Sequence, residues 1–463
     1  MLPDNYLSSN LRKNPVKVNF YYIHRKILVM KNHTLSRRKF IRQSVAATTA
    51  VSVFTIIPRN VLGKGFIPPS DKINLGFVGT GKLIHELFPR FAELPEVIIL
   101  AGCDVHRKKV EWFKGAVEKF YADKTGKTDY VNLVKYELYE ELLERQDIDA
   151  VVVATPDHWH ALASIAAIKA GKDVYCEKPL THRVKEGRAM VNAARKYDRV
   201  VQTGSMQRSW RDFRHASELV QNGYLGDIKE VWVYVGDPPV DCNLGEEPVP
   251  EYLNWDRWLG PAQFRPYNPI LAPPIEDENW PDWRRYNEFG GGGMTDWGAH
   301  MFDIAQWGLG TDGTGPVQII PPKKAKKVIG VKYIYNDGIK VIHKNFKRGY
   351  AVRFIGSEGT LDVSREFLDS KPENIAKIEL KDTDKHLYFS DNHYNNWIQC
   401  IKNRTRPAAD VEIGHRTASM CNIGNICYRL RRPLEWDPEK EEFKNDPEAN
   451  KLLTKDYRAP YVL

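Results

Sequence analysis

The chain has 463 residues, of which 42% are hydrophobic, so it is long enough for two domains and is not a disordered protein. Its formal net charge is +9, but residues 1–63 hold eleven Lys or Arg and a single acid. The remainder of the chain is therefore almost neutral, which argues against a nucleic-acid-binding protein.

The basic N-terminal segment predicts export. Residues 36–42 read Ser-Arg-Arg-Lys-Phe-Ile-Arg, which matches the twin-arginine signal, and residues 45–57 carry no charge. A membrane-spanning helix needs about 20 apolar residues, so this run has the length of a signal core. We expect a signal segment over residues 1–63, with Met30 as a second candidate start, and a periplasmic protein without a stable membrane anchor. A basic amphipathic helix is the alternative interpretation.

From residue 71 onward the chain alternates between strands and helices. The apolar run 148–154 is continuous, as in a strand buried on both faces of a parallel sheet. The alternation predicts a doubly wound α/β domain, which we place at residues 71–205. Its expected strands are 73–78, 97–103, 148–154, 173–176 and 200–203, and its expected helices are 83–94, 110–122, 136–145, 161–170 and 184–197.

The pattern changes after about residue 205, where strand-like runs dominate. They predict a second, α+β domain over residues 206–463 with a mainly antiparallel sheet. Its expected strands are 228–235, 327–334 and 339–343, and its late helices are 394–402 and 415–430. A stretch rich in Trp and Pro, residues 238–283, predicts packed loops that also wall a pocket. Four tryptophans there are candidates for stacking on a sugar, although part of them is expected in the core: Trp255, Trp258, Trp280 and Trp283.

The first expected strand ends in a glycine turn typical of dinucleotide binding. Gly79 and Gly81 permit a tight turn and the close approach of a pyrophosphate to a helix N-terminus, while Ile84 replaces the third glycine of the motif. Asp104 follows the second strand, where a carboxylate binds ribose hydroxyls and favours NAD. The basic residues 106–108 leave NADP open, because they could hold its extra phosphate.

Two further strands also end in polar residues, which in a doubly wound sheet face the ligand crevice. One is followed by Thr155-Pro-Asp-His-Trp-His160 and the other by Glu177-Lys178-Pro179. The lysine is suited to stabilising an alkoxide, although an ordinary exposed lysine is the alternative. No metal site is expected, because no further ligands accompany the histidines. The six cysteines form no Cys-x-x-Cys pair, so free and mostly buried thiols are expected.

A run of four glycines, residues 290–293, precedes the most unusual segment of the second domain. Asp296 and His300 follow it at a spacing of four, which places both on one face of a helix. A carboxylate beside an imidazole is the arrangement of a general base. A capping Asp with a core His is the competing interpretation.

Taken together, the TPDHWH, EKP and D-x-G-x-H segments resemble those of the Gfo/Idh/MocA (glucose-fructose oxidoreductase / inositol dehydrogenase) family. The resemblance covers residues 71–463, including the run 410–415 and the ending 457–460. It implies a Rossmann domain followed by an open-sheet domain that forms dimers or tetramers. It also implies a cis peptide before Pro179. Lys178, Asp296 and His300 would be catalytic, and the cofactor-binding residues would be Gly79, Thr80, Gly81, Asp104, Thr155, Pro156, Asp157, His160, Glu177 and Lys178.

The resemblance implies an NAD(P)-dependent oxidoreductase that acts on a sugar, glycoside or polyol hydroxyl. In that mechanism His300 takes the hydroxyl proton, Asp296 orients His300, and Lys178 stabilises the oxyanion. Export implies that NAD, or NADP, stays bound and is recycled in the site. Two alternatives remain, namely a redox-neutral glycosidase and a non-catalytic sugar or nucleotide sensor. Some relatives are such glycosidases but tend to lack the EKP run, and retention of all three catalytic residues argues against the sensor.

Overall fold

A computed structural model describes residues 71–277, 279–324 and 327–463, so the predicted signal segment lies outside the described residues. The first part is built on a six-stranded parallel sheet in the order β3-β2-β1-β4-β5-β6. This is the doubly wound α/β fold that the sequence predicts. Its elements are β1 (Ile73–Val78), α2 (Ile84–Ala92), β2 (Val97–Cys103), α3 (Arg107–Thr125), β3 (Val134–Tyr136), α4 (Tyr139–Leu143), β4 (Ala150–Val153), α5 (Asp157–Lys169), β5 (Asp173–Cys176), α6 (Val184–Lys196) and β6 (Val201–Thr203).

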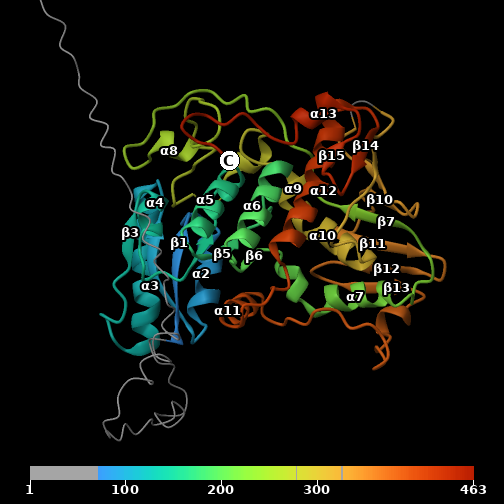
Figure 1. Ribbon diagram of the computed structural model, residues 1–463, viewed down its shortest axis with the longest axis horizontal. Helices are drawn as coiled ribbons and strands as arrows, with labels where there is room; N and C mark the ends of the chain where they lie inside the picture. Colours follow the sequence, from blue (N-terminus) through green and yellow to red (C-terminus); the bar gives the residue numbers. More distant parts are fainter. Residues whose placement is uncertain (1–70, 278, 325–326) are drawn as a thin grey trace, which may run out of the picture. The chain divides into compact units, whose positions relative to one another are not determined.

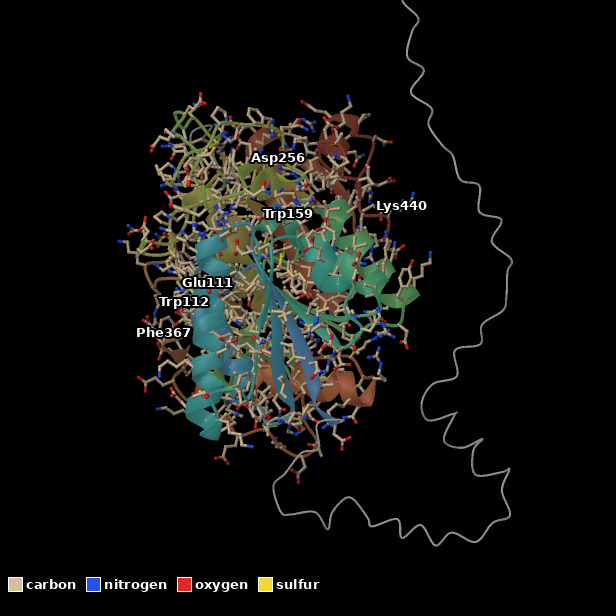
Figure 2. The ribbon with its side chains drawn as sticks, turned by 90° about the vertical axis from the view of Figure 1, so that its left-hand side faces the viewer. Glu111, Trp112, Trp159, Asp256, Phe367 and Lys440 are labelled. Carbon is tan, nitrogen blue, oxygen red and sulfur yellow. The ribbon has the colours of Figure 1, made fainter. Side chains whose placement is uncertain are left out.

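Side chains of the parallel strands alternate between two hydrophobic cores. Leu75 and Phe77 of β1 face the core beneath α2 and α3, whereas Val78 faces the core beneath α5 and α6. Strand β4 alternates in the same way, with Val152 on the first side and Val153 on the second. Figures 1 and 2 show α3 on one side of the sheet and the helices α5 and α6 on the other. Burial on both faces explains why these strands read as continuous apolar runs.

The second part is an α+β arrangement around a nine-stranded sheet in the order β13-β12-β11-β7-β10-β9-β8-β14-β15. All of its pairings are antiparallel except β7 with β10. Its elements are η3 (Met206–Ser209), α7 (Arg211–Gln221), β7 (Ile228–Tyr234), α8 (Trp255–Leu259), η4 (Asp282–Arg285), α9 (Gly293–Asp296), α10 (Gly298–Leu309), β8 (Gln318–Ile320), β9 (Lys332–Ile334), β10 (Lys340–His343), β11 (Ala351–Gly356), β12 (Thr360–Val363), β13 (Leu368–Lys371), η5 (Ile375–Lys377), α11 (His393–Asn403), α12 (Val411–Leu430), β14 (Leu434–Asp437), β15 (Glu442–Phe443) and α13 (Pro447–Lys451).

Three predicted elements differ in kind or continuity from the structure, and the helices α3, α5 and α12 begin three or four residues earlier than predicted. The helix expected over 136–145 is instead the end of β3 followed by the short α4, because β3 pairs with β2 as the edge strand of the parallel sheet. Of the strand expected over residues 327–334, only the last three residues form a strand, β9. The single helix expected through Asp296 and His300 is divided, since α9 ends at Asp296 and α10 begins at Gly298.

The two late helices return to the first part of the chain. Trp397 of α11 is fully buried against the rings of Phe91 in α2 and Tyr175 in β5, each 5.7 Å away. Figure 1 shows α11 beside α2 although the two are far apart in sequence. Helix α12 packs on both α6 and α10. The described residues therefore belong to one compact unit in which both sheets share helices. Among the described residues, we find no helix with the length and apolar character needed to span a membrane.

Candidate active site

The glycine turn after β1 leaves room for a pyrophosphate. Gly79 has a φ of +86°, and a Cβ there would lie 2.8 Å from the backbone of Ala154, so only glycine fits. A Cβ on Gly81, by contrast, would have no atom within 4 Å. Gly81 therefore faces open space, as the backbone that approaches a dinucleotide does. Ile84, at the position of the missing third glycine, is fully buried in the core beneath α2.

Asp104 is fixed directly after β2. Its Oδ2 accepts hydrogen bonds from the Thr80 backbone N–H at 2.7 Å and from the Thr80 hydroxyl at 3.2 Å. Its Oδ1 accepts one from the backbone N–H of His106 at 2.9 Å. Asp104 lines the cavity described below, but Thr80 is fully buried and does not. Thr80, which was predicted to bind the cofactor, thus connects the glycine turn to this carboxylate.

The segment after β4 leads directly into α5, which begins four residues earlier than the predicted helix. Asp157 is the first residue of α5 and is almost fully buried. Burial raises the pKa of Asp157 well above its ordinary value, and the negative charge of Asp296 acts in the same direction. Thr155, Pro156 and Asp157 all line the cavity. Asp157 is therefore a buried carboxyl group with a raised pKa near the predicted reacting centre.

The two histidines of this segment bind backbone carbonyls. His160 places Nδ1 2.8 Å from the oxygen of Pro179 and Nε2 2.9 Å from that of Thr155, so its ring links the loops after β4 and β5. His158 places Nε2 3.1 Å from the oxygen of Trp258. His160 also lines the cavity. No cluster of three or more His, Cys, Asp and Glu suited to a metal occurs within the described part of the chain.

Lys178 joins the two parts of the chain. Its Nζ donates to Oδ1 of Asp296 at 2.6 Å and to the backbone oxygen of Asp296 at 3.1 Å. The Lys178–Pro179 peptide is cis, as the family resemblance implied. Burial acts to raise the pKa of Asp296, but the charges of Lys178 and Arg284 outweigh it and hold that pKa below its ordinary value. The result is a partly buried ion pair at the carboxyl end of β5.

Glu177 lies beneath this lysine, buried against Gly204. A Cβ on Gly204 would lie 2.7 Å from Oε2 of Glu177, so the small residue makes space for the carboxyl group. Burial raises the pKa of Glu177 to about 7. Oε2 accepts a hydrogen bond from the Lys178 backbone N–H at 3.1 Å. Glu177 thus supports the backbone that carries the lysine.

His300 lies on the same cavity, in the first turn of α10. Its ring is buried, and its Nδ1 has no hydrogen-bond partner among the described residues. Burial lowers the pKa of His300 well below its ordinary value, and the charges of Lys178 and Arg365 act in the same direction. The ring is therefore neutral near pH 7. The sequence paired Asp296 with this imidazole, but the structure pairs Asp296 with Lys178 because the helix is interrupted at Trp297.

The glycine run brings these residues to the cavity. Gly292 has a φ of +68°, and a Cβ on Gly293 would lie 2.4 Å from Cα of Gly236, just after β7. The run therefore packs against the strand without side chains and directs α9 and α10 toward Lys178.

All of these features surround one cavity of about 630 Å³, large enough for a cofactor and a small substrate. Every predicted site residue except Thr80 lines this cavity. It is also lined by residues that the sequence reasoning missed, of which Arg284, Trp297 and Arg365 lie near the reacting centre. Arg284 and Arg365 come from η4 and from the loop between β12 and β13, and no local sequence pattern distinguishes them from other loop arginines.

The tryptophan-rich segment divides as expected between core and cavity. Trp255 stacks on Trp258 with ring centroids 4.7 Å apart and does not line the cavity. Trp258 and Trp283 are buried in a core cluster but also line it. Trp280 is 46% exposed and is the one of the four most available to a ligand. Figure 2 shows Trp159 of α5 below Asp256 of α8, and the Trp159 indole donates to the oxygen of Trp258 at 2.9 Å.

Two segments in the family resemblance have structural roles. In the run 410–415, Glu412 pairs with Arg188 of α6 at 2.8 Å, and buried His415 contacts Glu441 at 2.6 Å. These contacts hold α12 on α6.

In the C-terminal ending, Tyr457 donates to Glu186 at 2.8 Å and Arg458 donates to the oxygen of Gly260 at 2.9 Å. The ending thus fastens the α8 segment to α6.

A glycine turn on a parallel sheet, a strand-end lysine and a neutral histidine facing one cavity are typical of a dinucleotide-binding oxidoreductase. Comparison with family models gives the particular family. Residues 73–205 match the NAD-binding Rossmann fold of an oxidoreductase family, and residues 215–463 match the C-terminal α/β domain of the same family. The chain therefore belongs to the Gfo/Idh/MocA oxidoreductase family.

Individual relatives are distant. The chain is 26% identical over 209 residues to a glycosyl hydrolase family 109 protein of Shewanella baltica and 27% identical to an alpha-N-acetylgalactosaminidase of Shewanella oneidensis. Each match covers 42% of this chain and 45% of the relative, so the chain spans about half the length of these relatives.

Among solved structures, the fold is similar to the WlbA dehydrogenase of Bordetella pertussis in complex with NADH and UDP-GlcNAcA, with a TM-score of 0.53 at 18% identity. It is also similar to the aldose-aldose oxidoreductase of Caulobacter crescentus complexed with glycerol, with a TM-score of 0.52 at 18% identity. Both matches cover 79% of this chain and 99% of the other. At this identity they show a shared fold.

The glycine turn offers a direct test of cofactor binding. Replacing Gly81 with valine is expected to weaken nicotinamide dinucleotide binding by about tenfold or more, because the new side chain fills the space open to the pyrophosphate. The thermal midpoint should not fall, since a Cβ there meets no protein atom. Titration of NAD into cofactor-free protein measures the effect, with Gly115→Ala on α3 as the control. Unchanged affinity would place the cofactor elsewhere.

Proposed function

We propose that the protein transfers a hydride between a secondary hydroxyl of a sugar, glycoside or polyol and a tightly bound nicotinamide cofactor, and that a glycoside 3-dehydrogenase is the specific form. The observation that carries this proposal is the Lys178–Asp296 pair, which lies with neutral His300 on the cavity entered by the glycine turn. An alcohol oxidation requires this combination, namely a donor for the oxyanion and an acceptor for the proton.

Each residue of the pair has a defined role in this proposal. The Lys178 ammonium has three N–H donors, and Asp296 accepts from two of them. The third is available to the oxygen of the reacting hydroxyl. Asp296 is then a positioning residue for Lys178. His300, which lines the cavity with a buried, neutral ring, accepts the hydroxyl proton.

Residues of the glycine turn, Asp104 and the segment 155–157 would hold the cofactor. When bound, the nicotinamide supplies the hydride acceptor and donor. The fixed carboxylate of Asp104 favours NAD, because it accepts from ribose hydroxyls and repels a 2′-phosphate. Of the basic residues 106–108, His106 lines the cavity with Asp104, whereas Arg107 and Lys108 do not; the neighbouring Lys109 also lines it, and NADP is the alternative.

The proposal is tested by identifying the nicotinamide released on denaturation of the purified protein. Candidate glycosides are then added to the intact protein while the absorbance of reduced nicotinamide is followed. A keto-sugar product with reduced cofactor supports the proposal. A protein that neither carries nor binds a nicotinamide would overturn it.

A second candidate function is redox-neutral glycoside cleavage. The glycosyl hydrolase relatives favour it, although they match less than half of this chain. In this reaction oxidation at C3 would acidify the C2 proton, and elimination would release the aglycone and leave a C1–C2 double bond. Water would then add at C1 with a proton at C2, and the hydride would return to C3. Free aglycone with no net change in nicotinamide absorbance would distinguish it from a dehydrogenase. A non-catalytic sensor would bind sugar and produce neither change.

We further propose that the protein is exported to the periplasm by the twin-arginine route, on the basis of residues 36–42. Replacing Arg37 and Arg38 together with lysine is expected to retain the protein in the cytoplasm, since the signal depends on the arginine pair. Fractionation of cells followed by immunodetection measures this. Lys31→Arg, which exchanges a basic residue outside the motif and downstream of Met30, should export normally. Equal export of both variants would contradict the prediction.

The expected partners are a small carbohydrate substrate and further copies of the chain, with neither nucleic acid nor a stable membrane anchor. The outer side of the nine-stranded sheet supports homo-oligomers, because it carries Trp232 with Lys344 3.2 Å above its ring and Arg353 5.4 Å away. Aromatic and arginine side chains are enriched at protein interfaces. We therefore propose that the protein forms a dimer or a tetramer.

A further inference from the structure

Two arginines of the cavity have no role in the chemistry described above. Arg284 lies in η4 and Arg365 in the loop between β12 and β13, and both line the cavity. Within the described residues, neither has a carboxylate oxygen within the 4.0 Å of an ion pair. Arg284 donates one hydrogen bond, to the backbone oxygen of Pro281 at 3.0 Å. Most of the donors of these two side chains are therefore available.

Both guanidinium groups are held in place by tryptophan rings. Arg284 lies 4.5 Å from the Trp283 ring and 5.0 Å from the Trp280 ring. Arg365 lies 4.6 Å from the Trp297 ring and 5.5 Å from that of Trp210. Stacking on a ring face uses the π surface of the guanidinium and leaves its N–H groups, which lie in the plane, free for a planar anion.

The two arginines act on the reacting centre. The positive charge of each lowers the pKa of Asp296, and that of Arg365 also lowers the pKa of His300. The charge of Lys178 is compensated by its partner Asp296. Asp157, Asp296 and Glu86 also line the cavity, but none of them has a carboxylate oxygen within 4.0 Å of either guanidinium. The cavity therefore carries two arginines near the reacting centre that form no ion pair with a described side chain.

We propose that the substrate carries an anionic substituent and that Arg365, with Arg284, binds it. A carboxylate, sulfate or phosphate group fits, because each accepts two parallel N–H donors from one guanidinium. The inference that the substrate is a sugar rests on the proposed function, whereas the inference of an anionic group rests on the two arginines. Arg365 would then determine specificity between acidic and neutral sugars.

The experiment is calorimetric titration of the intact, nicotinamide-loaded protein with sugars matched in all but one group. The panel pairs glucose with glucuronate, galactose with galacturonate and mannose with mannuronate, and adds the 6-sulfate and 6-phosphate of glucose. In at least one comparison we expect the anion to bind about tenfold tighter or more than its neutral partner, and the excess to fall with ionic strength. Comparison among the anions identifies which group is preferred.

Variants assign the preference to the arginines. Arg365→Gln is expected to reduce the preference to less than about threefold, and Arg284→Gln to reduce it in part. Arg285→Gln is the control, because this neighbouring arginine is exposed, pairs with Asp282 at 3.1 Å and does not line the cavity. Nicotinamide content should be unchanged in all three variants. Loss of the cofactor from Arg365→Gln would assign this arginine to the cofactor and overturn the proposal.

Two results separate this inference from the proposed function. Neutral sugars that bind as well as every anion, or no binding by any member of the panel, would overturn the anionic substrate. Reduction of the nicotinamide by neutral sugars would at the same time leave the proposed function intact. Arginine-dependent binding of an acidic sugar without any change in nicotinamide absorbance would support the inference and count against the proposed dehydrogenase.

Discussion

Replacing Lys178 with methionine is expected to lower kcat by about a hundredfold to a thousandfold, the usual effect of removing one donor to a developing oxyanion. The side chain keeps its length, so the cavity retains its shape. Asp296 loses the partner that lies 2.6 Å from its Oδ1, and no other group can donate from that position to the hydroxyl. Steady-state kinetics with a glycoside that the parent protein oxidises measure the loss.

The matched control is Lys169→Met, at the exposed end of α5 in the same part of the chain. It should leave kcat and the bound nicotinamide unchanged. Asp296→Asn should fall between the parent and Lys178→Met, because the lysine remains but is less firmly positioned. Undiminished turnover in Lys178→Met would remove the lysine from the mechanism. Loss of bound nicotinamide from that variant would show that the lysine holds the cofactor as well.

Much of the fold could be predicted because its signals are local. The strand ending at Val78, the turn at Gly79 and the buried run of β4 each follow from short-range patterns, since parallel strands buried on two faces are apolar throughout. The edge strand β3 escaped detection because two of its three residues are exposed. Residues of such a strand carry no continuous apolar pattern.

The site was only partly predictable from the sequence, because the contacts between its side chains depend on how the two sheets pack. The motifs indicated Lys178, Asp296 and His300, but their spacing suggested that Asp296 would orient His300. The interruption at Trp297 turns the aspartate toward Lys178, which is 118 residues earlier in the chain. Arg365 could not be found at all, since it reaches the cavity only through the order of β12 and β13 in the sheet. Contacts of this range have no signature in a single sequence.

Replacing Arg208 with methionine is expected to destabilise the protein by about 3–5 kcal/mol near pH 7, as removing one partner of a buried ion pair does. The guanidinium is 2% exposed and bonds Asp303 at 2.8 and 2.9 Å and Asp312 at 2.9 and 2.6 Å. Without it, Asp303 remains fully buried with the Thr417 hydroxyl, 2.9 Å away, as its hydrogen-bond donor. Denaturant unfolding followed by circular dichroism measures the difference, with the exposed Arg211→Met as the control.

The pH dependence of this loss identifies its cause. Burial already raises the pKa of Asp303 with Arg208 beside it, and removal of the arginine must raise that pKa further. A carboxyl whose pKa is higher in the folded than in the unfolded protein binds more protons when folded, so its folded form loses stability as pH rises. The deficit of Arg208→Met should therefore shrink from pH 7 toward pH 5. Adding Asp303→Asn should recover at least half of it, because the amide oxygen still accepts from Thr417 and no charge remains buried. A deficit that is constant with pH and persists in the double variant would instead indicate lost packing against Trp307, whose ring lies 5.0 Å from the guanidinium.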